Sequence, residues 1–185
     1  MTRKHLEPLF LSLLASALLI FTLFFNITRY YSQHYSVMAY SLAKGHFDLI
    51  GEFREKYLDT VVIAGKTYFT ADPGTAILLL PIAAILLPFD KVPPQWVLNI
   101  ILVLFSTYAL QKILLAKGVT QSASRIWLTL TFFFATSVVS IIYVPNTWNL
   151  AQTVALTLSL IFISEYLARR RLFVLLPLIL AMAFT

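Results

Sequence analysis

Five apolar runs constrain the fold of this chain more than any other feature of its sequence. They cover residues 9–25, 96–115, 126–144, 148–167 and 172–185. A helix needs about 20 mostly apolar residues to cross a bilayer, and the three middle runs come close to that length. Hydrophobic residues make up 59% of the sequence and charged residues only 12%, whereas a soluble domain carries roughly a quarter charged residues. The sequence therefore predicts an all-α polytopic membrane protein, built as a bundle of transmembrane helices.

A long polar stretch, residues 26–95, follows the first run and is predicted to be a loop outside the cytoplasm. Apolar residues recur at helical spacing over residues 32–44, and Gly45 follows them, which predicts a helix lying on the membrane surface. Residues 74–89 are also apolar, but they number only about 16 and include a proline. They are therefore predicted to form a second surface helix rather than a span.

Between the two surface helices the sequence predicts a β-hairpin. Residues 60–63 and 66–69 are rich in β-branched and aromatic side chains, which favour strands. They flank Ala64 and Gly65, and a two-residue connection containing glycine makes the tight turn that a hairpin needs. The loop is therefore expected to carry two interfacial helices and one small hairpin.

Charge leaves two orientations in the membrane open. If residues 74–89 do not cross and the N-terminus is cytosolic, the cytosolic side holds eight basic and two acidic residues, and the outer side holds six of each. If residues 74–89 cross and the N-terminus is outside, eleven basic residues lie inside and three outside. That arrangement leaves Arg3 and Lys4 outside, beside the first run, whose charge usually dominates. We favour the first orientation because residues 74–89 are short, and it predicts a cytosolic N-terminus.

The residues that the sequence lacks exclude several classes of function. Because there is no cysteine, disulfides, thiolate metal sites and cysteine nucleophiles are excluded. The sequence contains no glycine-rich phosphate loop and no Ser-His-Asp set, and its three histidines offer little for a metal cluster. The net charge of +6 comes from sparse charged residues, which do not make the basic patch of a nucleic-acid-binding protein.

The loop contains a series of motifs in a particular order. An aromatic-rich helix ending at Gly45 comes first, followed by Asp59-Thr60, Gly65-Lys66-Thr67-Tyr68-Phe69, Pro73-Gly74 and Leu78-Leu79-Leu80-Pro81. This order resembles the N-terminal part of bacterial polytopic glycosyltransferases of the GT-C type, relatives of protein mannosyltransferases and of the aminoarabinose transferase of lipid A. The resemblance implies an enzyme of the bacterial cytoplasmic membrane that moves a sugar from a polyprenyl-phosphate donor to a glycan, lipid or protein acceptor at the outer face. It also implies that the chain is the front part of a longer enzyme and is inactive as this fragment.

The resemblance and the chemistry of the loop single out two groups of candidate side chains. The candidates for accepting a proton or orienting the acceptor are His34, Asp48 and Asp59. The candidates for contacting the donor are Lys66, Tyr68, Arg54, Lys56 and Asp72. No cofactor is required by these residues, although a divalent ion between Asp59 and Asp72 stays an open alternative.

Each candidate also has a purely structural interpretation. Asp48 and Asp59 are of a type common in turns, and Lys66 suits a solvated lysine or one that holds lipid head groups. The second hypothesis is therefore a non-catalytic membrane scaffold or assembly partner whose loop docks another protein. A transporter is a weaker third hypothesis, because the apolar runs contain almost none of the charged residues that mark an ion or substrate path.

Overall fold

The structure of the chain is a computed structural model that describes residues 33–50, 59–136, 147–168 and 171–183, together with residues 10, 13, 14, 17 and 138. This described part is mostly helical. In chain order its elements are α2 (His34–Ala43), β1 (Thr60–Ile63), β2 (Lys66–Phe69), α3 (Gly74–Leu86), the 3-10 helix η3 (Leu87–Phe89), α4 (Gln95–Ala116), α5 (Ser122–Phe134), α7 (Thr147–Ala168) and α8 (Leu172–Ala183). Apart from four positions, the predicted span over 9–25 lies outside the described residues, as do the candidates Arg54 and Lys56.

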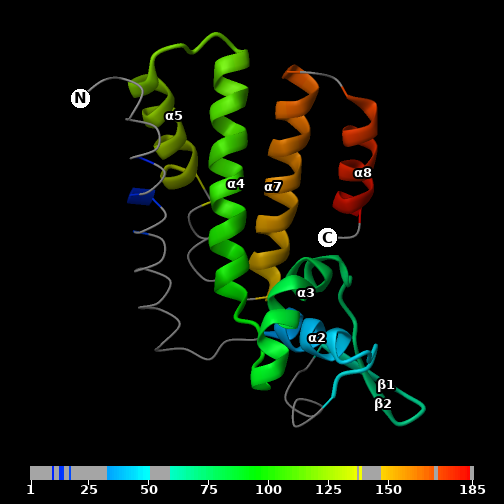
Figure 1. Cartoon of the computed structure of the whole chain (residues 1–185). Helices are drawn as coiled ribbons and strands as arrows, with labels where there is room; N and C mark the ends of the chain where they lie inside the picture. The colour runs from blue at the N-terminus through cyan, green and yellow to red at the C-terminus, as the bar shows by residue number, and fades with distance from the viewer. Residues whose placement is uncertain are drawn as a thin grey trace.

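Two long helices, α4 and α7, form the centre of the molecule. They run side by side in the same direction, with α5 next to α4 and α8 next to α7 (Figure 1). Each has 22 residues and is therefore about 33 Å long, close to the hydrocarbon thickness of a bilayer. Of the described helices, these two are long and apolar enough to cross a membrane. Their ends lie one residue outside the predicted runs 96–115 and 148–167.

The helix α5 ends at Phe134, although the apolar run predicts a helix that continues to residue 144. The side chain of Thr136 gives the reason. Its hydroxyl group donates to the carbonyl of Phe132 at 2.6 Å and accepts the backbone N–H of Val138 at 3.3 Å. Such side-chain bonds compete with the backbone bonds of a helix, and the chain bends at this point. The predicted span over 126–144 is therefore not one continuous helix.

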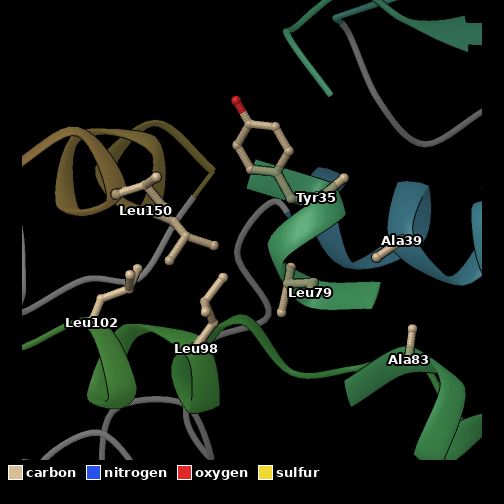
Figure 2. Packing of buried hydrophobic residues seen from close by; sticks show 9 residues of the cluster. Tyr35, Ala39, Leu79, Ala83, Leu98, Leu102 and Leu150 are labelled. Carbon is tan, nitrogen blue, oxygen red and sulfur yellow. The ribbon is translucent and has the colours of Figure 1, made fainter. Parts of the chain in front are cut away.

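A hydrophobic cluster joins the loop elements to the two long helices (Figure 2). Figure 1 places α2, α3 and the hairpin at the end where α4 and α7 begin. The cluster takes buried side chains from four helices: Tyr35, Ala39, Ala76, Leu79, Ala83, Leu98, Leu102, Leu150 and Val154. Because buried apolar surface is the main stabilising contribution, one core fixes both the long helices and the loop that lies on their ends.

The hairpin forms at the residues where the sequence predicts it. Strands β1 and β2 are antiparallel, with Thr60 opposite Phe69 and Ile63 opposite Lys66. Ala64 and Gly65 both have positive φ, 52° and 75°, which is the backbone of a type I′ turn. The twist of that turn matches the twist of the two strands, so the connection holds them in register.

Candidate functional site

His34 lies where three elements of the fold meet. It is the first residue of α2 and is only 5% exposed. Its backbone N–H donates to the hydroxyl oxygen of Thr147, the first residue of α7, at 3.2 Å. Its ring lies 4.6 Å from the ring of Phe69 on β2, measured between centroids. The sequence candidate His34 is therefore held between α7 and the hairpin.

The imidazole of His34 is also influenced by Asp59. Burial lowers the pKa of His34, the negative charge of Asp59 opposes that effect, and the net result is a lowered pKa. Asp59 lies directly before β1, and its carbonyl accepts the backbone N–H and the hydroxyl of Thr70 at 3.1 and 3.0 Å. These bonds close the base of the hairpin, so the position of Asp59 is fixed by the strand pairing.

A second aspartate candidate, Asp72, acts on the residue next to His34. Burial is the main cause that raises the pKa of Tyr35, and the charge of Asp72 adds to the rise. Asp72 itself is exposed. The charges of Asp59 and Asp72 therefore act on two consecutive residues of α2. Within the described ranges, however, no group of three or more His, Cys, Asp or Glu residues could hold a metal ion.

Asp48 belongs to a neighbouring group on the loop after α2. It is buried at 5% exposure, and its carboxylate lies 3.8 Å from Nζ of Lys66 and 3.6 Å from Nδ1 of His46. Burial alone would raise the pKa of Asp48, but its own backbone amide and the charges of Lys66 and His46 outweigh burial and lower it. The backbone N–H of Leu49 donates to the carbonyl of Thr67 at 2.7 Å, which ties this loop to β2.

The alternation of side chains along β2 separates the remaining candidates. Thr67 is buried, and Phe69 packs against α2, so these two lie on the inner face of the strand. Lys66 and Tyr68 lie on the other face, where Lys66 is exposed and Tyr68 half-buried. Tyr68 is therefore not brought into the group around His34, and Lys66 reaches Asp48 rather than His34.

Two site residues, Thr147 and His46, were not among the candidates. Thr147 contacts His34 across 113 positions of the chain, and no local pattern in the sequence indicates such a contact. His46 follows the glycine that ends α2, and only the folded loop brings it next to Asp48. A buried polar residue at the start of an apolar helix is the one signal that could have drawn attention to Thr147.

A separate set of polar contacts holds α2 against the end of η3. Asp90 follows η3 with a positive φ of 53°. Its carboxylate accepts hydrogen bonds from the hydroxyl of Tyr40 and, at 2.8 Å, from Nζ of Lys44. Nζ of Lys44 also lies 4.4 Å from the centre of the Tyr40 ring. The hydrogen bonds from Lys44 and Tyr40 hold the pKa of Asp90 below its ordinary value.

Replacing Asp90 by asparagine is expected to lower the melting temperature at neutral pH and to have no effect in strong acid. Because the folded-state pKa is the lower one, the stabilisation is complete above the ordinary Asp pKa of about 3.9. It is lost as the pH falls through the folded-state value. Thermal unfolding of the wild-type chain and Asp90→Asn over a range of pH measures the difference. A constant difference at every pH would contradict this assignment.

Comparisons of the chain with protein families, with curated proteins and with solved structures find no match.

Proposed function

We propose that this chain is an integral protein of the bacterial cytoplasmic membrane and part of a GT-C-like glycosyltransferase, which uses a polyprenyl-phosphate sugar at the outer face. One observation carries the proposal: His34, Asp59 and the hairpin meet where two helices of membrane length begin. A proton acceptor close to the head group of a lipid-linked substrate is suited to act as the general base of such a transfer.

The apolar surface of α3 and η3 supports a polytopic arrangement in a bilayer. No charged residue occurs from Gly74 to Phe89. One face of α3 packs into the hydrophobic cluster, while Ile77 is 52% and Ile85 70% exposed on the rest of the helix. Because α3 lies at the start of the long helices (Figure 1), its exposed apolar side chains are placed to contact the interfacial region of a bilayer. This arrangement agrees with residues 74–89 lying on the membrane rather than crossing it.

The distribution of charge supports the proposed orientation. Lys112 and Arg125 lie towards the end of α4 that is remote from the site, and Arg171 follows α7 at the same end (Figure 1). At the site end, Lys44 and Lys66 each lie beside an aspartate. An excess of Lys and Arg marks the cytosolic side of a membrane protein. The remote end is therefore cytosolic in the proposal, as is the N-terminus, and the site faces outward.

The proposed reaction is a displacement at the anomeric carbon of the donor sugar. An acceptor hydroxyl oxygen bonds to that carbon, the bond from the carbon to the phosphate oxygen breaks, and its electron pair leaves with the phosphate. His34 takes the proton of the acceptor hydroxyl, because its lowered pKa keeps the imidazole neutral near pH 7. Asp59 then stabilises the imidazolium that forms.

Positively charged groups at this end of the molecule are suited to stabilise the negative charge of the leaving phosphate. The helices α2, α3, α4 and α7 all begin there (Figure 1), and each helix N-terminus carries a partial positive charge. Lys66 is 58% exposed beside Asp48, so its ammonium group is open to exchange this ion pair for a phosphate. These groups are proposed to bind the polyprenyl phosphate.

The exposed hairpin favours the scaffold hypothesis as the second candidate. Val62 and Ile63 at its tip are 67% and 59% exposed, and Phe47 on the adjoining loop is 81% exposed. Apolar side chains gathered on one surface often mark a protein contact. If the chain only docks a partner, substitutions in the hairpin tip should disrupt association, while substitutions at His34 and Asp59 should leave it intact.

Sugar transfer in native membranes tests the proposal. Native membranes that contain the whole gene product to which this chain belongs, as the wild type or with His34→Gln or Asp59→Asn, are supplied with a panel of radiolabelled polyprenyl-phosphate hexoses and pentoses. Removing a general base lowers a rate by about 10²–10⁴-fold, and we expect His34→Gln to fall in that range. Asp90→Asn is the matched control, because it removes a carboxylate of the same loop away from the site.

Two results would contradict the proposed function. One is that wild-type membranes transfer no more sugar from these donors than membranes from cells in which the gene is deleted. The other is full transfer by His34→Gln and Asp59→Asn at wild-type protein levels. If Val62→Lys then abolishes co-purification of another membrane protein while His34→Gln does not, the scaffold becomes the better interpretation.

A further inference from the structure

The first turn of α2 receives its cap from a different helix. The first backbone N–H groups of a helix have no partner within it, and a side chain just before the helix usually supplies one. Gln33, which precedes α2, makes no such bond. The hydroxyl oxygen of Thr147 accepts the N–H of His34 instead. Thr147 is 2% exposed and begins α7, so this bond links the loop directly to a membrane-length helix.

The same residue is held from its other side by the hairpin. The His34 ring meets Phe69 at an angle of 42° between their planes, and Phe69 also meets the Tyr35 ring edge-on at 5.7 Å. The bond from Thr147 fixes the backbone of His34, whereas Phe69 limits how far the imidazole can turn. Both restraints are needed, because a side chain keeps one orientation only if its own backbone does not shift.

We propose that Thr147 is a positioning residue, whose hydroxyl group couples the start of α7 to the first turn of α2 and so keeps the His34 imidazole buried against Phe69. The proposal rests on the proposed function only for what His34 does in the reaction. The positioning role of Thr147 predicts that a displacement of α7 relative to the loop changes the environment of the His34 imidazole. Substrate-dependent movement of α7 would then act on the proton acceptor through one hydrogen bond.

The test measures the titration of His34 in the complete chain, in lipid nanodiscs, by NMR of ¹³C-labelled histidine. Variants that lack either of the other two histidines assign the signal. In the wild-type chain, burial holds the pKa of His34 below about 6.5. The charged groups to consider are Asp59 at the hairpin base, which acts on His34, and Asp72, which acts on Tyr35. Thr147→Val removes the hydroxyl group at nearly the same volume and is expected to move the midpoint upward, towards the ordinary value.

Two matched variants separate positioning from a general loss of stability. Thr147→Ser keeps the hydroxyl group and is expected to restore the wild-type midpoint. Thr153→Val makes the same change six residues further along α7, where the hydroxyl of Thr153 bonds the carbonyl of Asn149 within the same helix, at 2.9 Å. It is expected to leave the His34 midpoint unchanged even if it lowers the melting temperature.

Several results would overturn the proposal. It fails if Thr147→Val lowers the melting temperature but leaves the His34 midpoint at its wild-type value, or if Thr153→Val shifts the midpoint equally. Should Thr147→Val not fold, hydrogen exchange in the wild-type chain still decides, because the His34 amide must then exchange slowly, and fast exchange contradicts the bond. None of these readouts involves a sugar donor, so failure of the glycosyltransferase proposal is recognised separately by the transfer assay.

Discussion

Replacing Arg125 by methionine is expected to lower the free energy of unfolding by about 3 kcal/mol, because one buried and two part-buried acceptors lose a charged donor. Arg125 is 4% exposed. Its guanidinium donates to the side-chain oxygen of Gln111 at 3.2 Å and to the carbonyls of Val119 and Thr120 at 3.0 and 2.8 Å. These bonds hold the turn between α4 and α5 against the end of α4. Equilibrium unfolding of the purified chain in detergent measures the loss.

The control for Arg125 is Lys112→Met, which removes the same charge from the same end of α4. Lys112 is exposed, with Nζ 4.6 Å from the centre of the Tyr108 ring. An exposed cation–π contact contributes less than about 1 kcal/mol, so this variant should unfold almost like the wild-type chain. Equal effects of the two variants would show that net charge matters at this end, and not the buried hydrogen bonds of Arg125.

Replacing Leu79 by alanine is also expected to cost about 3 kcal/mol, within the range for removing a buried leucine side chain. Leu79 is completely buried on the face of α3 that meets α2 and the two long helices. Figure 2 shows its side chain beside that of Leu98 and below that of Tyr35. The cavity would weaken the attachment of α3 to the starts of α4 and α7, so the loop should loosen before the rest of the chain unfolds.

Ile85→Ala on the same helix is the matched control for Leu79→Ala. Ile85 is 70% exposed, so the substitution removes an aliphatic side chain of the same size from the opposite environment. Surface substitutions usually change stability by less than about 0.5 kcal/mol. Proteolysis of the loop, followed alongside unfolding, should accelerate for Leu79→Ala and not for Ile85→Ala. The assignment of the core would be wrong if the two variants behaved alike.

Local signals in the sequence predict most of the individual elements. The apolar runs give α4 and α7 to within one residue at each end, because a buried or lipid-facing helix is apolar along its whole length. Gly45 ends α2 with a φ of 81°, as expected of a glycine that closes a helix. The turn at Ala64 and Gly65 follows from the same conformational preference of glycine. These features depend on neighbouring residues only.

The contacts that build the candidate site could not be predicted in the same way. The bond from His34 to Thr147 and the contact of Tyr40 with Asp90 join residues 113 and 50 positions apart. Spacing within a helix or strand does not specify such pairs. The sequence predicts a helix that continues past Phe134 for a different reason. A threonine in an apolar run does not by itself indicate a helix end, and Thr136 interrupts the helix through the bonds that its hydroxyl makes.

The side of the membrane on which the hairpin lies decides whether the site can meet a lipid-linked sugar at the outer face. The chain has no cysteine, so Val62→Cys at the exposed hairpin tip and Lys117→Cys after α4 each introduce a single thiol. Intact cells are treated with a membrane-impermeant maleimide, and lysed cells serve as the reference. The proposed orientation predicts that the thiol at position 62 reacts in intact cells and the thiol at position 117 only after lysis. Reaction at position 117 in intact cells, with position 62 protected until lysis, would contradict a site for a lipid-linked sugar at the outer face.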